Sequence, residues 1–472
     1  MSIVATFQEL RTAFDSGVTR PLKWRLKQIA QVEKMVKKHR REWEAALHAD
    51  LGKAGVDAHL TEISQVLGEI THTRKHLAKW MRDAKAKTPL TLAPGRSWVR
   101  HDPLGVVLII SPWNYPLQLQ LSPLVGAFAG GNTVVLKPSE VASHTEKLVA
   151  KLVPQYFDRS VVQVITGGPE VVSQAIAQKP NHVFFTGSTP VGKIIAEQCG
   201  KHLIPTTLEL GGKSPTYVHK DANLKTAARR IVWGKFTNAG QTCVAPDHIY
   251  VHRKVAKEFT KLLVKEIKKQ YGKAPHKSAH YGRIITEKHA QRLNDLIVDG
   301  LAFGSAAGGA KKNSRPQLLC GGNTDVANRY IDPTVITGVT EDNPLMAEEI
   351  FGPILPVITV RNFAEAAAKI NLRPQPLAFY VFAKSRKLLS EAVDTVSSGG
   401  VAINAPLVHL ATPYLPFGGV GESGLGNYHG KWSFETFTHE RAVLKKNNCP
   451  DTIKLIAAPV GRVSESIIRR FM

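Results

Sequence analysis

The sequence has few cysteines and no long apolar run, and both absences narrow what the protein can be. Its 472 residues include four cysteines, Cys199, Cys243, Cys320 and Cys449. No pair has the CxxC spacing of zinc sites and redox motifs, so we expect neither a metal site nor a disulfide framework. A reducing compartment such as the cytoplasm fits best. No stretch approaches the ~20 apolar residues of a membrane-spanning helix, which predicts a soluble protein.

Acidic residues are also scarce, with 38 Asp and Glu against 62 Lys and Arg and a formal charge of +24. Such an excess can indicate a nucleic-acid partner, an anionic membrane or simply a basic solvated surface. Because the cations are spread along the chain without a nucleic-acid motif, we favour the basic surface and expect no nucleic-acid partner. The charge would still attract an anionic dinucleotide or hold the protein loosely at an acidic membrane. The N-terminus lacks the pattern of a secretory signal.

The first part of the chain has two stretches, 24–47 and 60–80, in which apolar residues recur at helical spacing. They predict two amphipathic helices that pack onto the domain that follows. Short apolar runs then alternate with helix-like segments, which favours a parallel sheet covered on both faces. The expected strands are 106–110, 133–136, 161–165 and 182–185. Ligands bind such sheets beyond the carboxyl ends of their strands.

A second alternating region runs from about residue 206 to 405. Its expected strands are 249–252, 355–360, 378–382 and 401–404. The chain length also suggests two or three domains. We therefore predict an α/β protein with two doubly wound domains, one Rossmann-like for a cofactor and one catalytic, and a small bridging β ribbon. The expected cofactor domain is 1–81 and 102–206, the catalytic domain 207–412, the bridging or oligomerisation segments 82–101 and 413–445, and the tail 446–472.

The segment 304–315 interrupts the second domain with Gly, Ala, Lys and Ser. This composition is typical of a mobile surface excursion, and we assign it no chemistry.

Cys243 lies in Asn-Ala-Gly-Gln-Thr-Cys-Val-Ala-Pro-Asp, where small and amide side chains surround it. The flanking Gly and Pro predict a tight loop that would display the sulfur as a nucleophile. A lone cysteine is, however, more often a small buried apolar residue.

Glu209 and Asn114 are candidates for supporting such a nucleophile. Glu209 lies between two leucines and before two glycines, and an apolar setting raises a carboxyl pKa toward that of a general base. A structural carboxylate bonded to backbone amides is the equal alternative. Asn114, between Trp113 and Tyr115, could stabilise an oxyanion, although a turn role is commoner.

Two stretches are candidates for binding a dinucleotide. Gly187, Ser188 and Gly192 follow an expected strand and enter a helix, whose first N–H groups favour phosphate. The pattern is neither GxGxxG nor a P-loop, and an ordinary strand-to-helix turn fits it about as well. Lys137 and Glu140 also follow a strand and suit ribose hydroxyls, but a surface charge pair is the alternative.

Taken together, these motifs resemble the NAD(P)-dependent aldehyde dehydrogenase superfamily over nearly the whole chain. PWNYP, KPSE, FTGSTPVG, LELGGKS, GQTCVAPD and EEIFGP occur here in the order of that family. The later stretches LPFGGVG and YHGKWSF resemble its class 3 and fatty aldehyde branch.

The resemblance implies oxidation of medium- or long-chain aliphatic, or aromatic, aldehydes to carboxylic acids with NAD or NADP. Cys243 would attack the aldehyde carbon, the Asn114 amide and the Cys243 N–H would stabilise the oxyanion, and Glu209 would activate the water that releases the acid. By the same analogy the cofactor would contact Trp113, Lys137, Glu140, Gly187, Ser188, Gly192, Glu349 and Phe351.

The resemblance leaves three points open. A coenzyme A-acylating dehydrogenase is an alternative, which Glu209 argues against, and a non-catalytic binding protein with the same fold is another. Glu140 would favour an unphosphorylated ribose, but the branch uses both cofactors. We expect a homodimer joined through the ribbon, and no spanning anchor, because charges and Pro459 interrupt residues 451–472; the basic end could still touch a membrane.

Overall fold

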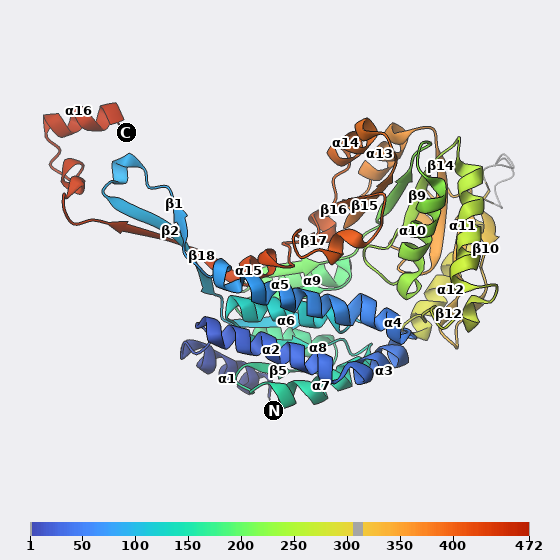
Figure 1. The fold of residues 1–472 in the computed structure, drawn as a ribbon, viewed down its shortest axis with the longest axis horizontal. Coiled ribbons are helices and arrows are strands. Elements are labelled where there is room, and N and C mark those ends of the chain that lie inside the picture. Colours follow the sequence, from blue (N-terminus) through green and yellow to red (C-terminus); the bar gives the residue numbers. More distant parts are fainter. Residues whose placement is uncertain (1, 305–314, 472) are drawn as a thin grey trace.

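The computed structural model of the protein describes residues 2–304 and 315–471. Figure 1 shows two α/β lobes side by side and a thin β arm that projects from the N-terminal lobe and carries the C-terminus at its tip. The prediction of two α/β regions with a small ribbon is confirmed. Most of the segment for which we predicted mobility, 305–314, lies outside the described residues.

The N-terminal sheet has the strand order β17-β7-β6-β3-β4-β5. Its strands are β3 Val106–Ile110, β4 Thr133–Lys137, β5 Val162–Val164, β6 His182–Thr186, β7 Thr206–Glu209 and β17 Gly424–Leu425. All neighbours are parallel except β17, which runs antiparallel to β7. The predicted strands are confirmed, while β7 was missed because Thr-Thr-Leu-Glu contains no apolar run.

Helices cover both faces of this sheet. Its bounding helices are α1 Ile3–Asp15, α6 Gln118–Gly130, α7 Ser143–Tyr156, α8 Pro169–Ala177 and α9 Thr189–Gly200. One core joins Phe7 of α1, Val172 of α8 and Ile195 of α9 to one face of β3. A larger core packs Val125 of α6 and Leu152 of α7 on the other face. In sheets of this kind, ligands bind outside the carboxyl ends of the strands.

The N-terminal helices correct one prediction. Residues 24–47 are not one helix, because α2 Leu22–Lys38 ends at His39 and α3 Arg40–Leu51 begins after it. The His39 ring contacts Tyr156 Oη and Glu42 Oε1, which holds the break in place. Both helices bury their apolar stripes, so apolar residues keep a helical spacing on both sides of the break. The spacing alone therefore does not reveal where the first helix ends. After α3 come α4 Gly55–Ala58, a π-helical turn His59–Ile63 and α5 Ser64–Trp80.

The C-terminal lobe contains a second sheet with the order β10-β13-β14-β9-β8-β15-β16. Its strands are β8 Pro215–Val218, β9 His248–His252, β10 Gln317–Cys320, β13 Thr334–Thr337, β14 Ile354–Val360, β15 Ala378–Phe382 and β16 Gly400–Ile403. Its helices are α10 Leu224–Phe236, α11 Ala256–Tyr271, α12 Glu287–Ala302, α13 Phe363–Asn371 and α14 Arg386–Thr395. β11 Thr324–Asp325 and β12 Tyr330–Ile331 form a small hairpin beside it.

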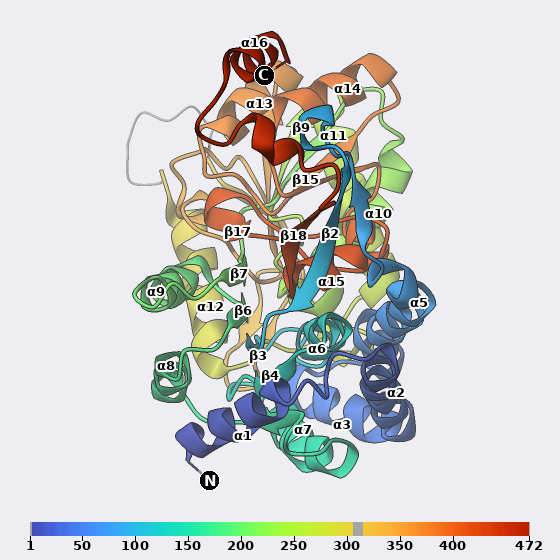
Figure 2. The same cartoon turned by 90° about the vertical axis from the view of Figure 1, so that its left-hand side faces the viewer.

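The arm is a twisted ribbon of β1 Ala84–Ala86, β2 Gly95–Pro103 and β18 Thr438–Lys446. β2 and β18 pair antiparallel from Pro103↔Thr438 to Gly95↔Lys446. Figure 2 looks at the molecule from the arm's side, with β2 and β18 toward the viewer and α16 Arg462–Phe471 at the top. Ahead of β18, α15 Lys431–Thr436 packs on α6, where Gly126 directly faces Ser433. The arm thus begins at the N-terminal lobe.

Candidate active site

The loop that carries Cys243 has an unusual backbone conformation. Asn238 and Ala239 both have left-handed φ angles of 53° and 52°, and Gly240 follows at 76°. A Cβ on Gly240 would come within 2.3 Å of the Gly352 carbonyl oxygen, so only glycine fits there. This tight turn leaves the Cys243 side chain half-buried rather than in the core.

Hydrogen bonds to two other segments hold this loop. Gln241 donates from Nε2 to the Arg283 carbonyl at 2.9 Å and accepts the Ile285 N–H at 2.9 Å. Tyr380 of β15 donates to the Val244 carbonyl at 2.6 Å. The sulfur is therefore displayed from a rigid frame, as a nucleophile requires.

Glu209 ends β7 as a buried carboxyl group, 3% exposed. Within the described part of the chain, neither of its oxygens has a hydrogen-bond partner. The structure therefore shows none of the backbone bonds that a structural carboxylate would accept. Burial alone raises the pKa of Glu209 well above its ordinary value. A raised pKa makes a carboxylate a stronger proton acceptor, as a general base requires.

Cys243 and Glu209 lie within electrostatic reach of each other. Burial is the main cause that raises the pKa of the Cys243 thiol, and the charges of Glu349 and Glu209 raise it further. The backbone N–H groups of Cys243 and Val244 act in the opposite direction. Since the thiolate is the nucleophilic form of a cysteine, the thiol proton must leave when the sulfur attacks.

Asn114 lies in the loop after β3 and reaches across to the nucleophile loop. Its side-chain Nδ2 donates to the Gln241 carbonyl at 3.1 Å, and its own carbonyl accepts from Asn238 Nδ2 at 2.9 Å. The next residue, Tyr115, shares a hydrogen bond of 2.6 Å with Thr242 Oγ1. The Asn114 amide, which has a second N–H, therefore lies beside Cys243.

The strand order of the N-terminal sheet places a ligand crevice at β3 and β6. From β3 the chain moves outward through β4 to β5, and then returns to β6 on the other side of β3. Dinucleotides bind at such a reversal, outside the carboxyl ends of the strands. Trp113 follows β3 there, and Gly187 and Ser188 follow β6.

The start of α9 is built for close approach of a phosphate. Its N-cap residue, Ser188, makes no side-chain capping bond among the described residues, and Pro190 occupies the first turn. A Cβ on Gly187 would meet the Phe185 ring at 2.4 Å, and one on Gly192 would meet Leu210 at 2.5 Å. The backbone N–H groups at this helix start are thus left for an anionic ligand.

Lys137 and Glu140 also lie at this edge. Lys137 ends β4 with its amine buried, and it forms an ion pair with Glu140, whose side chain is 41% exposed. Because the lysine is buried, this is more than a solvated surface pair. The two groups offer a donor and an acceptor suited to ribose hydroxyls.

Glu349 and Phe351 approach the site from the C-terminal lobe. A Cβ on Gly211 would come within 2.0 Å of Glu349 Oε2, so Gly211 makes room for this carboxyl group. Burial, then the charge of Asp247, raises the pKa of Glu349 to about 8. Phe351, with φ of 48°, packs edge-on against Trp113 at 5.4 Å between ring centroids.

An ion pair between Lys213 and Asp247, which the sequence did not reveal, connects three motifs. Lys213 Nζ donates to Asp247 Oδ1 at 2.5 Å and to the Leu345 and Glu348 carbonyls at 2.9 and 2.8 Å. Asp247 Oδ2 accepts the Ile350 N–H at 2.9 Å. The pair therefore fixes the Glu349 loop against the segments that follow Glu209 and Cys243.

The comparison with known proteins agrees with this geometry. The model of the aldehyde dehydrogenase family matches residues 2–443. The chain belongs to this family. It is 43% identical over 446 residues to the dimeric NADP-preferring aldehyde dehydrogenase of Rattus norvegicus, covering 94% of this chain and 95% of the rat protein. It is also 43% identical to aldehyde dehydrogenase family 3 member A2 of Macaca fascicularis, over 93% of this chain and 87% of that protein.

A solved structure is similar over the full length. The substrate-bound state of Staphylococcus aureus AldH superposes with a TM-score of 0.93 at 40% identity, covering 100% of this chain and 99% of that one. The protein is an NAD(P)-dependent aldehyde dehydrogenase of the family 3 branch, and it oxidises aldehydes to acids. Across residues 2–304 and 315–471, no helix has the length and apolar character needed to cross a membrane.

Other polar groups in this aldehyde dehydrogenase escaped the sequence reasoning. Lys235 of α10 is buried, and burial lowers its pKa to about 8. Next to Glu349, a cavity of about 570 Å³ is lined partly by Lys288 and Arg292 of α12. These three residues do not belong to a recognisable motif. The sequences of α10 and α12 have only the pattern of ordinary amphipathic helices.

Proposed function

We propose that this aldehyde dehydrogenase uses Cys243, Asn114 and Glu209 to oxidise medium- or long-chain aliphatic, or aromatic, aldehydes. The Cys243 thiol releases its proton to water, and the sulfur bonds to the aldehyde carbon while the π electron pair of the carbonyl moves to oxygen, which gives a thiohemiacetal anion. The second N–H of the Asn114 amide and the Cys243 N–H stabilise the negative oxygen that forms. Both donors belong to the rigid frame described above.

The second half of the reaction needs a base. When bound, NAD or NADP supplies the acceptor for the hydride that leaves the thiohemiacetal carbon. The resulting thioester is cleaved by water, whose proton passes to Glu209 while the C–S bond breaks and the carboxylic acid departs. The single observation that carries this proposal is the unpartnered, buried Glu209 carboxyl within electrostatic reach of the thiol.

The same observation separates hydrolysis from transfer to coenzyme A. An acylating enzyme passes the thioester to another thiol and has little use for a buried base. Burying a carboxyl group without a hydrogen-bond partner raises its pKa and costs free energy. A role in proton transfer accounts for such a group. We therefore favour water over coenzyme A as the acceptor.

For the cofactor, we propose the residues at the β3 and β6 crevice. Gly187, Ser188 and Gly192 would take the pyrophosphate, and Lys137 with Glu140 the adenosine ribose. Glu349 would take the nicotinamide ribose beside Trp113 and Phe351. The free helix start and the buried Lys137 amine support this fit.

The aromatic side chains near the thiol support the proposed substrate class. Tyr115 shares a hydrogen bond with Thr242 and Tyr380 donates to the Val244 carbonyl, so both side chains contact the residues that flank Cys243, and Tyr428 is buried as well. Phe417 packs against Tyr428 with ring centroids 5.9 Å apart. An apolar wall of this kind favours aliphatic and aromatic aldehydes over strongly hydrated ones.

A kinetic panel tests the proposal. Purified enzyme is mixed with hexanal, longer alkanals or benzaldehyde and with NAD or NADP, with and without coenzyme A. We expect cofactor reduction and free acid without coenzyme A, and no reduction by a Cys243→Ala control. A requirement for coenzyme A would replace hydrolysis by acyl transfer, and an active Cys243→Ala protein would remove Cys243 from its role.

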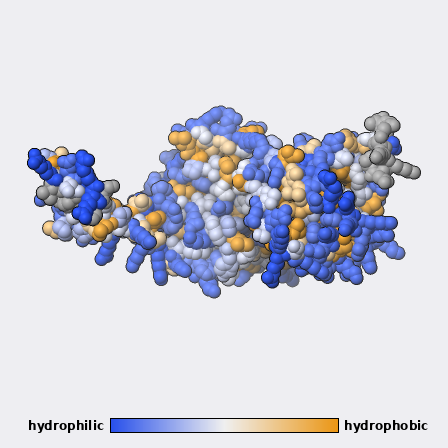
Figure 3. Space-filling model, turned by 90° about the horizontal axis from the view of Figure 1, so that it is seen from above, coloured by the Kyte–Doolittle hydropathy of each residue, from blue (hydrophilic) through white to orange (hydrophobic). Residues whose placement is uncertain are grey.

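We also propose a homodimer joined through the arm, acting in the cytoplasm with loose contact to acidic membranes. The rat relative is named as dimeric. The arm and tail expose apolar residues that a partner would cover, including Leu90 at 87% and Leu444 at 50%. Figure 3 shows a largely hydrophilic surface with small apolar patches, and α16 carries Arg469 and Arg470. Sedimentation tests the homodimer, and flotation with acidic lipid vesicles tests the membrane contact.

A further inference from the structure

Lys53 and Glu62 form an ion pair inside the N-terminal lobe, distant in sequence from every motif above. Lys53 Nζ lies 2.5 Å from Glu62 Oε1, and the two side chains are 3% and 0% exposed. Burying two charges is costly unless polar groups surround them closely. Here the remaining partners belong to one segment, the loop from Asn114 to Gln118.

The pair contacts several successive points of that loop. Lys53 Nζ donates to the Asn114 carbonyl at 3.0 Å and lies 4.0 Å from the centre of the Tyr115 ring. Glu62 Oε2 accepts the N–H groups of Leu117 and Gln118, at 2.8 and 3.2 Å, where α6 begins. The loop is thus fixed before and after its bend.

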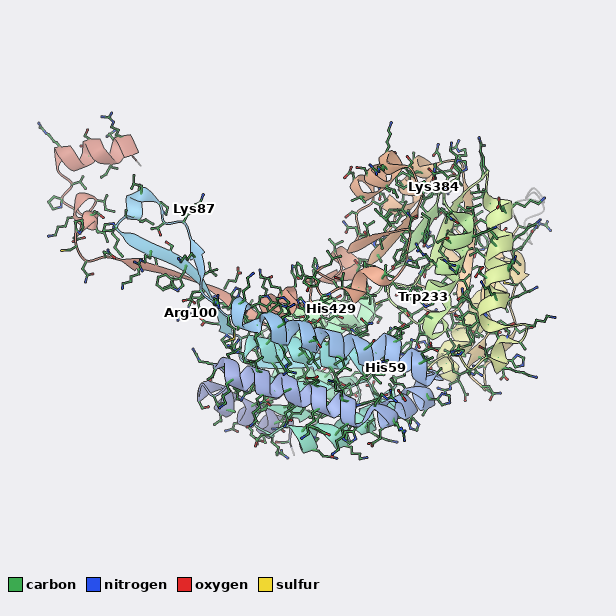
Figure 4. All side chains as sticks on the ribbon, viewed as in Figure 1. His59, Lys87, Arg100, Trp233, Lys384 and His429 are labelled. Carbon is green, nitrogen blue, oxygen red and sulfur yellow. The ribbon has the colours of Figure 1, made fainter. Side chains whose placement is uncertain are left out.

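The backbone at Glu62 is unusual as well. Glu62 lies in the π-helical turn His59–Ile63 between α4 and α5. π-helical turns are rare and concentrate at functional sites, because the wider turn redirects side chains. This turn lies at the end of the N-terminal lobe that faces the C-terminal lobe, as His59 shows in Figure 4. From this turn Glu62 reaches Lys53 and the start of α6.

The loop in turn contacts the nucleophile segment. Asn114 Nδ2 donates to Gln241, Asn238 donates back to Asn114, and Tyr115 bonds to Thr242. A shift of the loop would therefore move the Asn114 amide relative to the sulfur. A misplacement of about 1 Å at such a group can cost about 100-fold in rate.

We propose that Lys53 and Glu62 are positioning residues that hold the Asn114 amide where the oxyanion forms. The inference rests on the role of Asn114 given under Proposed function. A purely structural pair would contribute to folding alone, and its neutral replacement would leave the chemical step unchanged.

The test compares neutral variants in two backgrounds. Lys53→Met with Glu62→Gln removes both charges together, and the glutamine oxygen keeps an acceptor for the start of α6. The same double change is made in Asn114→Ala. Asp221→Asn is the matched control, because this carboxylate accepts the Lys384 and Ser385 N–H groups next to the start of α14, in the other lobe, and does not contact the loop. Stopped-flow absorbance of reduced cofactor gives the first hydride-transfer rate, and thermal unfolding gives stability.

We expect the double variant to fold and to lower the hydride-transfer rate about tenfold to 100-fold, with the KM for NAD unchanged. In Asn114→Ala, which alone lowers the rate about 100-fold, the double change should have no further effect, because its target is gone. Asp221→Asn should lower stability only.

Two results would overturn the inference: a double variant with the wild-type rate, or a loss that multiplies with that of Asn114→Ala. An Asn114→Ala enzyme with the full rate would instead remove the oxyanion role itself. If the double variant does not fold, Glu62→Gln alone enters the same comparison.

Discussion

The surroundings of Glu209 and of Asp247 differ sharply, although both are buried carboxyl groups near the nucleophile. Among the described residues Glu209 has no hydrogen-bond partner, whereas Asp247 binds Lys213 and the Ile350 N–H. Burial raises the pKa of Glu209, while at Asp247 it is outweighed by Lys213 and other cations, which hold its pKa well below the ordinary value. The proposed base thus has no hydrogen-bond partner among the described residues, whereas the carboxylate that connects the loops is fully bonded.

The largest expected effect comes from removing the unbonded carboxyl. Glu209→Gln should still transfer one hydride per site and then stall as the thioester, with steady-state turnover at least about 100-fold lower. Wild-type turnover should rise with pH as Glu209 loses its proton, and the variant should not share that rise. Burst kinetics across pH checks both. Rapid repeated turnover by the variant would assign the base to another group.

A smaller effect is expected on the bonded side. Asp247→Asn should leave Lys213 without its counter-charge and loosen the Glu349 loop, which raises the KM for NAD about tenfold while kcat changes little. Initial-rate kinetics against NAD measures the split. Asp221→Asn is the control, because Asp221 also accepts two backbone N–H groups, from Lys384 and Ser385, away from the site. An equal rise in both variants would contradict a local role.

The smallest effect concerns stability. A carboxyl whose folded-state pKa is raised adds stability below its unfolded pKa, near 4.5, and that stability is lost as pH rises through the folded pKa. Glu209→Gln lacks this loss, so its stability advantage over wild type should grow with pH, by at most about 1.4 kcal/mol per pH unit. Thermal unfolding from pH 5 to 9 measures the gap. A gap that stays constant would mean that the carboxyl is not destabilised by burial.

The sequence predicted some strands of the two sheets better than others. β3 and β15 were found to the residue, because continuous apolar runs end at turn residues. β7 and β8 were missed, since neither four-residue strand has such a run. Glu209, Cys243 and Asn114 were candidates by residue type, and their motifs named the family. Their meeting depends on contacts such as Asn114 to Gln241, 127 positions apart, which no local pattern encodes.

Lys53 and Glu62 show the same limit more clearly. Lys53 lies in a short link after α3, and Glu62 lies in what the apolar spacing suggests is an ordinary helix. Their role emerges only when the loop after β3 folds onto them. The Lys213 and Asp247 pair is adjacent to two motifs in the sequence. Its role likewise follows only from its contacts with the Glu349 loop in the folded protein.

The proposed oxyanion donor, Asn114, and the Cys243 sulfur belong to different lobes. Asn114 is attached to the sheet of one lobe, and Cys243 precedes β9 of the other. A slight hinge opening would separate them while every strand stayed intact. Heat or dilute denaturant should therefore silence turnover before circular dichroism records any loss of secondary structure.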